Sequence, residues 1–460
     1  MSRPMLFNFF LMNTPSHLFH GTWRHPESKS MFHMDLSTWT DLARIAERGL
    51  IDAIFIADNF GMYEEPGDEY ARVVQNAIQF PCADPTVLIS AMSLVTEHLG
   101  FIYTSSTLQQ HPSSFARAAA TLDHATKGRI GWNIVTSFVK NAARSVGVEN
   151  AWSHDERYRW AEEYVDVTYK LWEGSWDDGA VLRDVVRGIY ADPTKVHKIN
   201  HVGERFRVEG PLMVPPSPQR TPLLFQAGTS SAGQDFAARN AEGVFLISGS
   251  PHGAGEHARA IRDKARQFGR EPSDIVFLEG LSFVVGSTME EARRKEAEIE
   301  SYMSDEAGLI MSAAALGIDT TKYSPETRLV DLIEQSVGLR GGFDMVMNSS
   351  GKGREATLAD LIQFSSRNWR VVGTPETICD RIAEYQAQGI DGINIMYMLM
   401  PGTYVDFVDH VVPELRKRGL MKAAYAPGTL RQKMFPGAGS HINTRHPASR
   451  YKGHYGQHTR

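Results

Sequence analysis

The chain has 460 residues, of which 42% are hydrophobic and 22% are charged, so it can bury a full-sized core and is too apolar for a disordered protein. Its 54 acidic and 48 basic residues give a formal net charge of -6 and leave no basic surface for nucleic acid or an anionic membrane. The two cysteines, Cys82 and Cys379, are too far apart for a disulfide framework or a compact thiolate metal site, and they fit a reducing compartment. We therefore expect a small-molecule partner.

The first residues include a short apolar run, but Asn8, Asn13 and His17 interrupt it before it can form the core of a signal peptide. No later segment is apolar over the roughly 18 residues that a membrane helix needs. We therefore expect a cytoplasmic protein without membrane or nucleic-acid partners.

Short apolar runs alternate with longer amphipathic segments along the chain, a pattern typical of parallel strands joined by helices. Eight such alternations predict an α/β fold of the (β/α)8 TIM-barrel type. The predicted strands are residues 6–12, 52–57, 99–106, 129–137, 222–228, 243–249, 275–286 and 392–398.

Several helix boundaries are also readable. Asp84 and Thr374 each precede a proline, which is the pattern of a capping residue followed by proline in the first helical position. Apolar residues recur at three- and four-residue spacing between 404 and 415, so this last helix should lay one face against the barrel and end at Gly419.

A bare barrel needs roughly 250 residues, so the remainder must form insertions and a tail. We expect one domain over 1–426, with insertions near 58–83, 173–221 and 305–370 that shape pockets and lids. The tail, 427–460, is rich in Gly, Pro, His and Arg without periodicity, and we expect it to wrap another subunit or to be loosely held.

The segment after the fourth predicted strand offers one possible anion site. Ser153 followed by Glu156 forms a capping box, which places His154 in the first helical position. Tyr158 lies one turn later on the same face, so an imidazole and a phenol share the positive end of a helix dipole, where a phosphate can bind. The alternative is an ordinary capped surface helix.

A second possible anion site follows the fifth predicted strand. There Gly228 and Ser230 lead from the strand into a helix, a turn that presents backbone N–H groups and hydroxyls to an anion. The alternative is a simple strand-to-helix turn. Neither GxGxxG after a strand nor GxxxxGK[ST] occurs, which argues against a dinucleotide fold or an NTPase.

Three further polar residues belong to predicted strands. Asp58 follows the second strand at the barrel end where active sites form, although it could simply cap the next turn. Thr104 and Asn133 interrupt apolar runs in the third and fourth strands, and each could line a pocket or satisfy a hydrogen bond in the core.

Histidines after the first strand leave a metal-dependent hydrolase open. His17, His20 and His25 could bind zinc, but the chain lacks the H-x-H and H-E-x-x-H patterns of such sites, and also the G-x-S-x-G of a serine hydrolase. We favour His17 and His20 as residues that line or gate a substrate entrance, and we predict no metal site.

Taken together, several segments resemble the bacterial-luciferase-like flavin monooxygenases, in the branch that oxidises nitrilotriacetate, dibenzothiophene sulfone, dimethyl sulfide and long-chain alkanes. The resemblance spans most of the chain. It rests on GTWRHP (21–26), FIADNFG (55–61), TLDHATKGRIGWNIVTS (121–137), HDERYRWAEEYVDVTYKLWEGSW (154–176), YADPTKVHKINHVGERFRVEGP (190–211), PSPQRTPLLFQAGTSSAG (216–233) and PGTYVDFVDHVVPELRKRG (401–419).

The resemblance implies an enzyme that receives reduced FMN from a separate NAD(P)H:flavin reductase and uses O2 as co-substrate. It also implies a homodimer or homotetramer. His154, Tyr158 and Ser230 would surround the FMN phosphate. The positions that it assigns to flavin binding are Asp58, Thr104, Asn133, His154, Tyr158 and Ser230.

The substrate is less narrowly defined. Relatives that oxidise sulfones or alkanes carry histidines where this chain has Phe138 and Ala315, so His17 and His20 are the remaining catalytic candidates. The predicted strands supply no cluster of Arg or Lys for a polycarboxylate, so an apolar substrate of the sulfide, sulfone or alkane type is favoured over a chelate or amine.

A deazaflavin-dependent oxidoreductase and a flavin-binding protein without turnover also stay open at this point. Candidates for the pocket wall are Phe7, Phe10, Met12, Trp132, Met396 and Met398.

Overall fold

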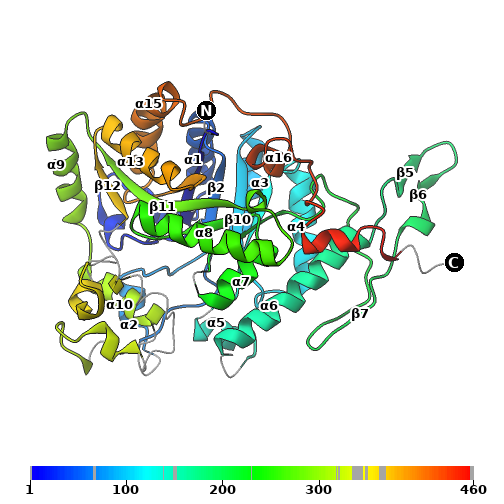
Figure 1. Cartoon of the computed structure of the whole chain (residues 1–460), viewed down its shortest axis with the longest axis horizontal. Coiled ribbons are helices and arrows are strands. Elements are labelled where there is room, and N and C mark those ends of the chain that lie inside the picture. The colour runs from blue at the N-terminus through cyan, green and yellow to red at the C-terminus, as the bar shows by residue number, and fades with distance from the viewer. Residues whose placement is uncertain are drawn as a thin grey trace.

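The computed structural model describes residues 3–65, 69–137, 139–148, 153–228, 230–316, 319, 322–333, 346–347, 351–361 and 369–455. Eight parallel strands close into a barrel that is surrounded by helices (Figure 1). Each strand pairs with the next in the ring, and the last pairs back with the first. The barrel strands are β1 (Leu6–Met12), β2 (Ala53–Ala57), β3 (Gly100–Ser106), β4 (Ile130–Val135), β9 (Leu223–Gln226), β10 (Gly243–Leu246), β11 (Val276–Val285) and β13 (Gly392–Met396).

All eight strands predicted from the apolar runs are present, so the predicted (β/α)8 barrel is confirmed. The sequence did not reveal β12 (Arg370–Gly373), which pairs with the second half of β11 outside the ring. It also did not reveal two antiparallel pairs, β5 (Val181–Asp184) with β6 (Ile189–Ala191) and β7 (His201–Val202) with β8 (Arg207–Val208). Strands this short carry too few residues for a recognisable alternation of polar and apolar side chains.

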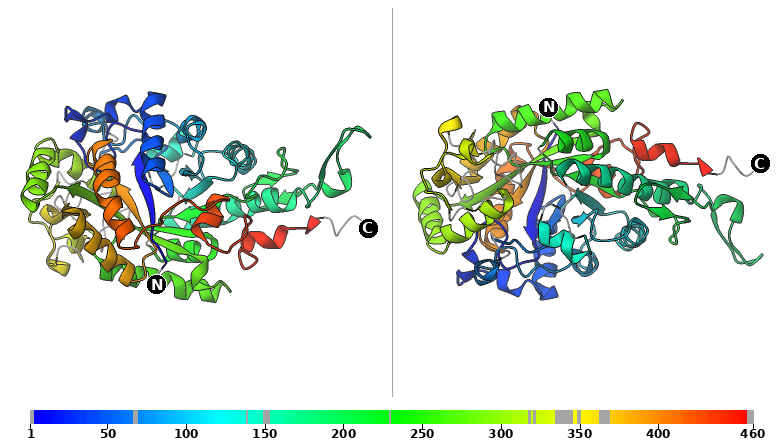
Figure 2. Two further views of the ribbon diagram at one scale, coloured as in Figure 1. Left: turned by 90° about the horizontal axis from the view of Figure 1, so that it is seen from above. Right: turned by 90° about the horizontal axis from the view of Figure 1, so that it is seen from below.

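Helices cover the outside of the ring in the order expected for repeated strand and helix units (Figure 2). The predicted caps are present, because Asp84 accepts a hydrogen bond from the backbone N–H of Thr86, and Thr374 accepts one from the N–H of Thr377. The helices against the barrel are α1 (Leu36–Arg48), α3 (Pro85–Leu94), α4 (Pro112–Ala125), α6 (His154–Tyr169), α7 (Ser231–Asn240), α8 (Pro251–Gln267), α9 (Met289–Glu300) and α13 (Pro375–Ala387).

The last predicted helix buries its apolar face, but it is not one regular helix. A π-helical turn (Phe407–Val411) separates α14 (Gly402–Asp406) from α15 (Val412–Lys417). Pro413, two residues after the turn, has no N–H group for a regular helical hydrogen bond. As predicted, the helix is followed by Gly419, which has a φ of 68°.

Two of the predicted insertions meet over the carboxyl ends of the strands. Tyr63 and Val73 from the first, which contains α2 (Ala71–Gln75), share an apolar cluster with Ala307 and Ile310 of α10 (Asp305–Leu316). In Figure 1 both helices lie at the lower side of the barrel. The insertion near 173–221 instead follows α6, and because helices run back along the barrel, it belongs to the opposite end.

The described part of the tail packs on its own barrel, so the expectation of a loosely held tail is wrong for residues 427–455. The helix α16 (Leu430–Met434) places Leu430 and Met434 in the interior cluster of the barrel, at the amino ends of the strands. Between them, the guanidinium group of Arg431 donates hydrogen bonds of 2.7 and 2.9 Å to the buried carboxylate of Glu242. The tail thereby closes one end of the barrel and leaves the other for a site.

Within the described residues, no helix combines the length and the apolar character that crossing a bilayer requires.

Candidate functional site

The first helical turns of α6 and α7 meet at the carboxyl end of the barrel. His154 begins α6 behind the predicted capping box of Ser153, and Ser230 is the N-cap residue of α7. The Nε2 atom of His154 lies 3.0 Å from the hydroxyl oxygen of Ser230, although 76 positions separate them in the sequence. The structure therefore joins the two anion sites that the sequence predicted separately.

Tyr158 completes this group. Its ring centroid lies 5.1 Å from that of His154, and its hydroxyl lies 3.5 Å from the Nε2 atom of Gln226. A Cβ atom at Gly233 would come within 2.7 Å of the Tyr158 hydroxyl and 3.1 Å of the Ser230 hydroxyl, so the absence of a side chain there keeps the space open. Burial raises the pKa of Tyr158, which therefore stays a neutral hydrogen-bond donor.

This cluster has the properties of a phosphate cradle. Two helix dipoles point their positive ends at it, and the first turn of each helix presents N–H groups that the helix itself does not use. A hydroxyl, a phenol and an imidazole add side-chain donors. The His154 side chain is 39% exposed, so a phosphate could reach it from solvent. We call His154, Tyr158 and Ser230 the cradle.

Asp58 lies beyond the end of β2, as predicted, and both of its carboxylate oxygens are held. The Nε2 atom of Gln109 donates to one oxygen at 2.9 Å, and the thiol of Cys82 lies 3.4 Å from the other. Gln109 is itself fixed, because its own oxygen accepts from the backbone N–H of Ser106 at 2.8 Å. Burial raises the pKa of Asp58, while the hydrogen bonds from Gln109 and Cys82 oppose that rise.

Thr104 and Asn133 are neighbours across β3 and β4. Asn133 donates a hydrogen bond of 2.9 Å to the Thr104 hydroxyl, and both residues are buried. The other side-chain atom, Oδ1 of Asn133, has no hydrogen-bond partner among the described residues. A buried amide oxygen without a partner is costly, so it points to a ligand that supplies a donor.

The cradle, Asp58 and the Thr104–Asn133 pair lie along one arc of the barrel, because β2, β3, β4 and β9 are consecutive in the ring. One end of the arc is suited to an anion, and the rest offers a carboxylate, a hydroxyl and an amide. These residues fit a flavin mononucleotide, which carries a phosphate at one end and hydrogen-bonding ring atoms at the other.

His17 and His20 follow β1 and lie inside the protein. The His17 ring centroid is 5.0 Å from that of Phe10, and the Nδ1 atom of His20 is 2.7 Å from the Ser16 hydroxyl. Burial lowers the pKa of His17 to about 3, helped by the neighbouring His20, and burial lowers the pKa of His20 to about 4. Both imidazoles are therefore neutral near pH 7 and can orient a substrate through hydrogen bonds rather than act as cationic acids.

Several polar residues of this end were not predicted from the sequence. Gln109 and Gln226 each support a predicted residue, Asp58 and Tyr158 respectively. A usable signal existed, because Gln226 is the last residue of an otherwise apolar strand and Gln109 follows another strand within three positions. A polar residue at the carboxyl end of a barrel strand is a general marker of function.

A buried carboxylate near this end was also missed. Glu279 on β11 is fully buried and accepts hydrogen bonds from the backbone N–H and the hydroxyl of Ser248, at 2.6 and 2.9 Å. Burial raises the pKa of Glu279 to about 7. Its side chain points away from the barrel interior, since its neighbour Leu278 belongs to the interior cluster and side chains alternate along a strand.

The residues predicted for the pocket wall divide between two apolar clusters. Phe10, Met396 and Met398 belong to the interior cluster of the barrel. Phe7 and Trp132 instead pack among the helices, so their assignment to the wall is wrong. Phe138 and the side chain of Ala315 lie outside the described residues.

In the part of the chain that the structure describes, no three His, Cys, Asp or Glu side chains gather closely enough to hold a metal ion. His25, which the sequence grouped with His17 and His20, is buried against Tyr302, with a distance of 4.8 Å between ring centroids. It therefore packs with Tyr302 instead of joining the other two histidines.

The fold and the arc of polar residues define a (β/α)8 barrel with a candidate site for a phosphate-bearing cofactor at the carboxyl ends of its strands. The sequence profile of the luciferase-like monooxygenases matches residues 10–392. The chain belongs to this family, and it is a flavin-dependent monooxygenase.

Similar proteins cover nearly the whole chain. The long-chain alkane monooxygenase of Geobacillus thermodenitrificans is 42% identical over 98% of this chain and 99% of its own length. The dimethyl-sulfide monooxygenase of Hyphomicrobium sulfonivorans is 39% identical over 99% of this chain and 95% of its own. The crystal structure of a riboflavin lyase with modified FMN and riboflavin superposes with a TM-score of 0.90, at 33% identity, over 98% of this chain and all of that one.

Proposed function

We propose that this protein is the oxygenase component of a two-component system. It receives reduced FMN from a separate NAD(P)H:flavin reductase and uses O2 to oxygenate a small, mainly apolar substrate of the sulfide, sulfone or alkane type. The bound flavin supplies two electrons and activates O2, so one oxygen atom enters the substrate and the other leaves as water. The proposal includes a homodimer or homotetramer that works in the cytoplasm.

The observation that carries this proposal is the cradle at the first turns of α6 and α7. In the proposed complex, His154, Tyr158 and Ser230 bind the phosphate of FMN. Asn133 turns its unpartnered Oδ1 atom toward a flavin donor, and Asp58 is held in place for the same ring system. Donors fixed before binding lose little entropy when the ligand arrives.

The positions of the buried arginines and the apolar interior of the barrel favour an apolar substrate over a polycarboxylate chelate. By whole-residue exposure four arginines of the described chain are buried, and all four lie in segments that lead into strands or in the tail, at the end of the barrel opposite the cradle. A fifth, Arg370, has a side chain that is 2% exposed, and it is paired with Glu296 and Glu300. The interior below the cradle is instead aromatic and methionine-rich. The buried arginines are Arg129, Arg220, Arg270 and Arg431.

His17 and His20 are the proposed residues of the substrate entrance. Because burial keeps both imidazoles neutral, their role is to exclude water and to orient polar atoms of the substrate. Replacing either by Phe should lower turnover with the preferred substrate while leaving the affinity for FMN unchanged.

The test is an anaerobic titration of the purified protein with photoreduced FMN, beside oxidised FMN and a reduced deazaflavin. After oxygen is added, sulfides, sulfones, alkanes and amines are screened for products that carry one atom from labelled O2. Preference for reduced FMN and an oxygen-labelled product support the proposal. Preference for the deazaflavin, with hydride transfer and no oxygen uptake, would replace it by a deazaflavin-dependent oxidoreductase.

A further inference from the structure

The sulfur atom of Met311 on α10 faces two nitrogen atoms at the proposed substrate entrance. The Nε2 atom of His20 lies 2.8 Å from this sulfur, and the Nε2 atom of Gln79 lies 3.9 Å from it. His20 and Gln79 are buried, whereas Met311 is only half-buried. A small solute can therefore approach the methionine side chain, although the two nitrogen atoms lie inside the protein.

Both nitrogen atoms carry a hydrogen that can point at the sulfur. Burial lowers the pKa of His20 to about 4, so the imidazole is neutral near pH 7 and carries a single hydrogen. We assign that hydrogen to Nε2, because the Ser16 hydroxyl lies 2.7 Å from Nδ1 and can donate to it. The Gln79 amide is oriented by the carbonyl oxygen of His17, which accepts from its Nε2 atom at 3.0 Å. Two N–H donors thus meet a thioether, which is only a weak acceptor.

The start of α10 is fixed to the same loop after β1. The backbone N–H of Ser304 donates to the carbonyl oxygen of His20 at 2.9 Å. The Ser304 hydroxyl also accepts from the Ala307 N–H at 3.2 Å, as a capping residue does. Met311 follows Ser304 by two helical turns and therefore lies on the same face of the helix. The helix is anchored to His20 near its first turn, and Met311 makes the second contact.

We propose that Met311 is a site of oxidation, where hydrogen peroxide converts the thioether to a sulfoxide that the N–H groups of His20 and Gln79 bind. The sulfur lone pair forms the new S–O bond while the O–O bond of the peroxide breaks. The proton on the transferred oxygen passes to the displaced hydroxide and gives water, so sulfur loses two electrons and the peroxide gains them. A sulfoxide oxygen is a much stronger acceptor than a thioether sulfur, and the flexible methionine side chain withdraws to make room for it.

In the oxidised chain, both donors hold α10 over the carboxyl ends of the strands and close the entrance. This effect is opposite to the usual one, because oxidation generally makes a methionine polar and disrupts its packing. The natural source of the oxidant rests on the proposed function, since hydrogen peroxide forms when a reduced flavin meets O2 without oxygenating a substrate. Peroxide added to the flavin-free protein tests Met311 by itself, so this inference and the proposed function can fail separately.

The first test identifies the product at Met311. The flavin-free chain is treated with hydrogen peroxide and digested, and its peptides are incubated with one or the other methionine sulfoxide reductase, each of which reduces one epimer. Because the two donors draw the oxygen to their side of the sulfur, only one reductase should restore Met311.

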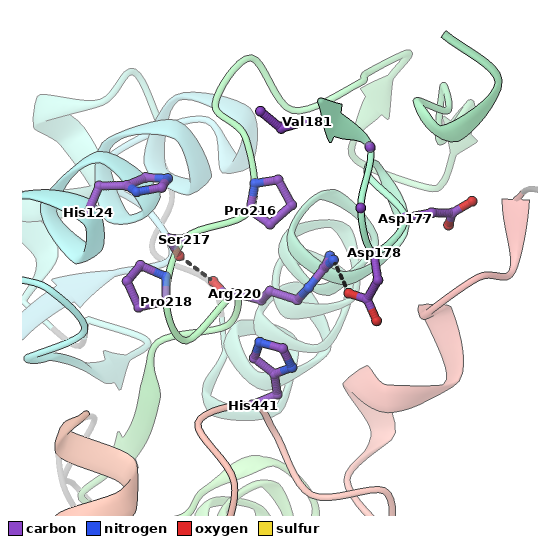
Figure 3. A pocket seen from close by; sticks show the side chains of 11 residues that line it. His124, Asp177, Asp178, Val181, Pro216, Ser217, Pro218, Arg220 and His441 are labelled. Atoms are coloured by element: carbon purple, nitrogen blue, oxygen red, sulfur yellow. Dashed lines mark hydrogen bonds and ion pairs between the residues drawn. The ribbon is translucent and has the colours of Figure 1, made fainter. Parts of the chain in front are cut away.

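The control for this test is Met213, which is 77% exposed and should yield both epimers. It lies shortly before Pro216, which lines a recess at the opposite end of the molecule (Figure 3). Absence of sulfoxide at Met311 once Met213 is fully oxidised would overturn the proposal. Equal amounts of the two epimers at Met311 would overturn it as well.

The second test measures hydrogen exchange of the α10 backbone by mass spectrometry. Exchange in the oxidised natural chain should be at least about threefold slower than in the untreated chain, because new hydrogen bonds hold the helix. Met311→Leu keeps every other methionine, and peroxide should leave exchange in its α10 unchanged. Met311→Gln, whose amide oxygen takes the place of the sulfoxide oxygen, should exchange slowly without peroxide. Unchanged or faster exchange in the oxidised natural chain, or equal slowing in oxidised Met311→Leu, would refute the inference.

Discussion

Replacing Ser230 by Ala tests the cradle with two separate readouts. The hydroxyl caps α7 by accepting a hydrogen bond of 3.1 Å from the Gly233 N–H, and it also lies 3.0 Å from His154. Losing a serine cap costs about 1 kcal/mol of folding free energy. Losing a hydrogen bond to a charged phosphate costs about 1.5–3 kcal/mol, so the affinity for reduced FMN should fall roughly 10- to 100-fold.

The chain provides a matched control in Ser250, which caps α8 in the same way by accepting from the Gly253 N–H at 3.2 Å. Ser250→Ala should cost similar stability and leave flavin affinity unchanged. Anaerobic calorimetric titrations with reduced FMN and with reduced riboflavin separate the two effects, because riboflavin lacks the phosphate. Ser230→Ala should weaken FMN only. Equal weakening of both flavins, or unchanged binding of FMN, would refute the assignment of Ser230 to the phosphate.

Three further predictions concern buried charges. Asp58→Asn should raise the melting temperature at pH 7 but weaken flavin binding. Because burial raises the pKa of Asp58, the ionised carboxylate destabilises the folded protein only above the unfolded pKa of Asp58. The gain in melting temperature of the variant should therefore vanish in acid. The folded pKa of Glu279, about 7, likewise exceeds its unfolded value. Denaturant titrations of the natural protein should therefore show the free energy of unfolding falling by up to about 3 kcal/mol as the pH rises toward 7. Glu279→Gln should remove this dependence on pH. Arg431→Ala leaves the buried Glu242 carboxylate without its ion-pair partner and should lower the free energy of unfolding in urea by about 3–5 kcal/mol. Loss of the half-exposed Arg445 side chain should lower it by about 1 kcal/mol or less. An unchanged urea midpoint for Arg431→Ala would contradict the role assigned to the tail.

The sequence predicted well wherever the signal was local. Eight apolar runs gave the eight barrel strands, since a strand buried on both faces needs a continuous apolar stretch. Because the strands are apolar on both faces, the sequence could not show which residues face inward. Phe7 and Phe10 are equally apolar, but only Phe10 faces the barrel interior. His154 and Tyr158 could be paired from their spacing alone, because one helical turn fixes their relation.

Contacts between distant segments were decided only by the tertiary structure. The meeting of His154 with Ser230 depends on β4 and β9 becoming neighbours when the barrel closes. The support of Asp58 by Gln109 depends on the register of β2 with β3, and the burial of Arg431 depends on the tail folding back under the strands. Periodicity and motif spacing report only on residues that are close in the chain, whereas these contacts join segments tens to hundreds of positions apart. The sequence alone therefore determined the eight barrel strands and the local groups of the candidate site, and barrel closure decided which of those groups lie together.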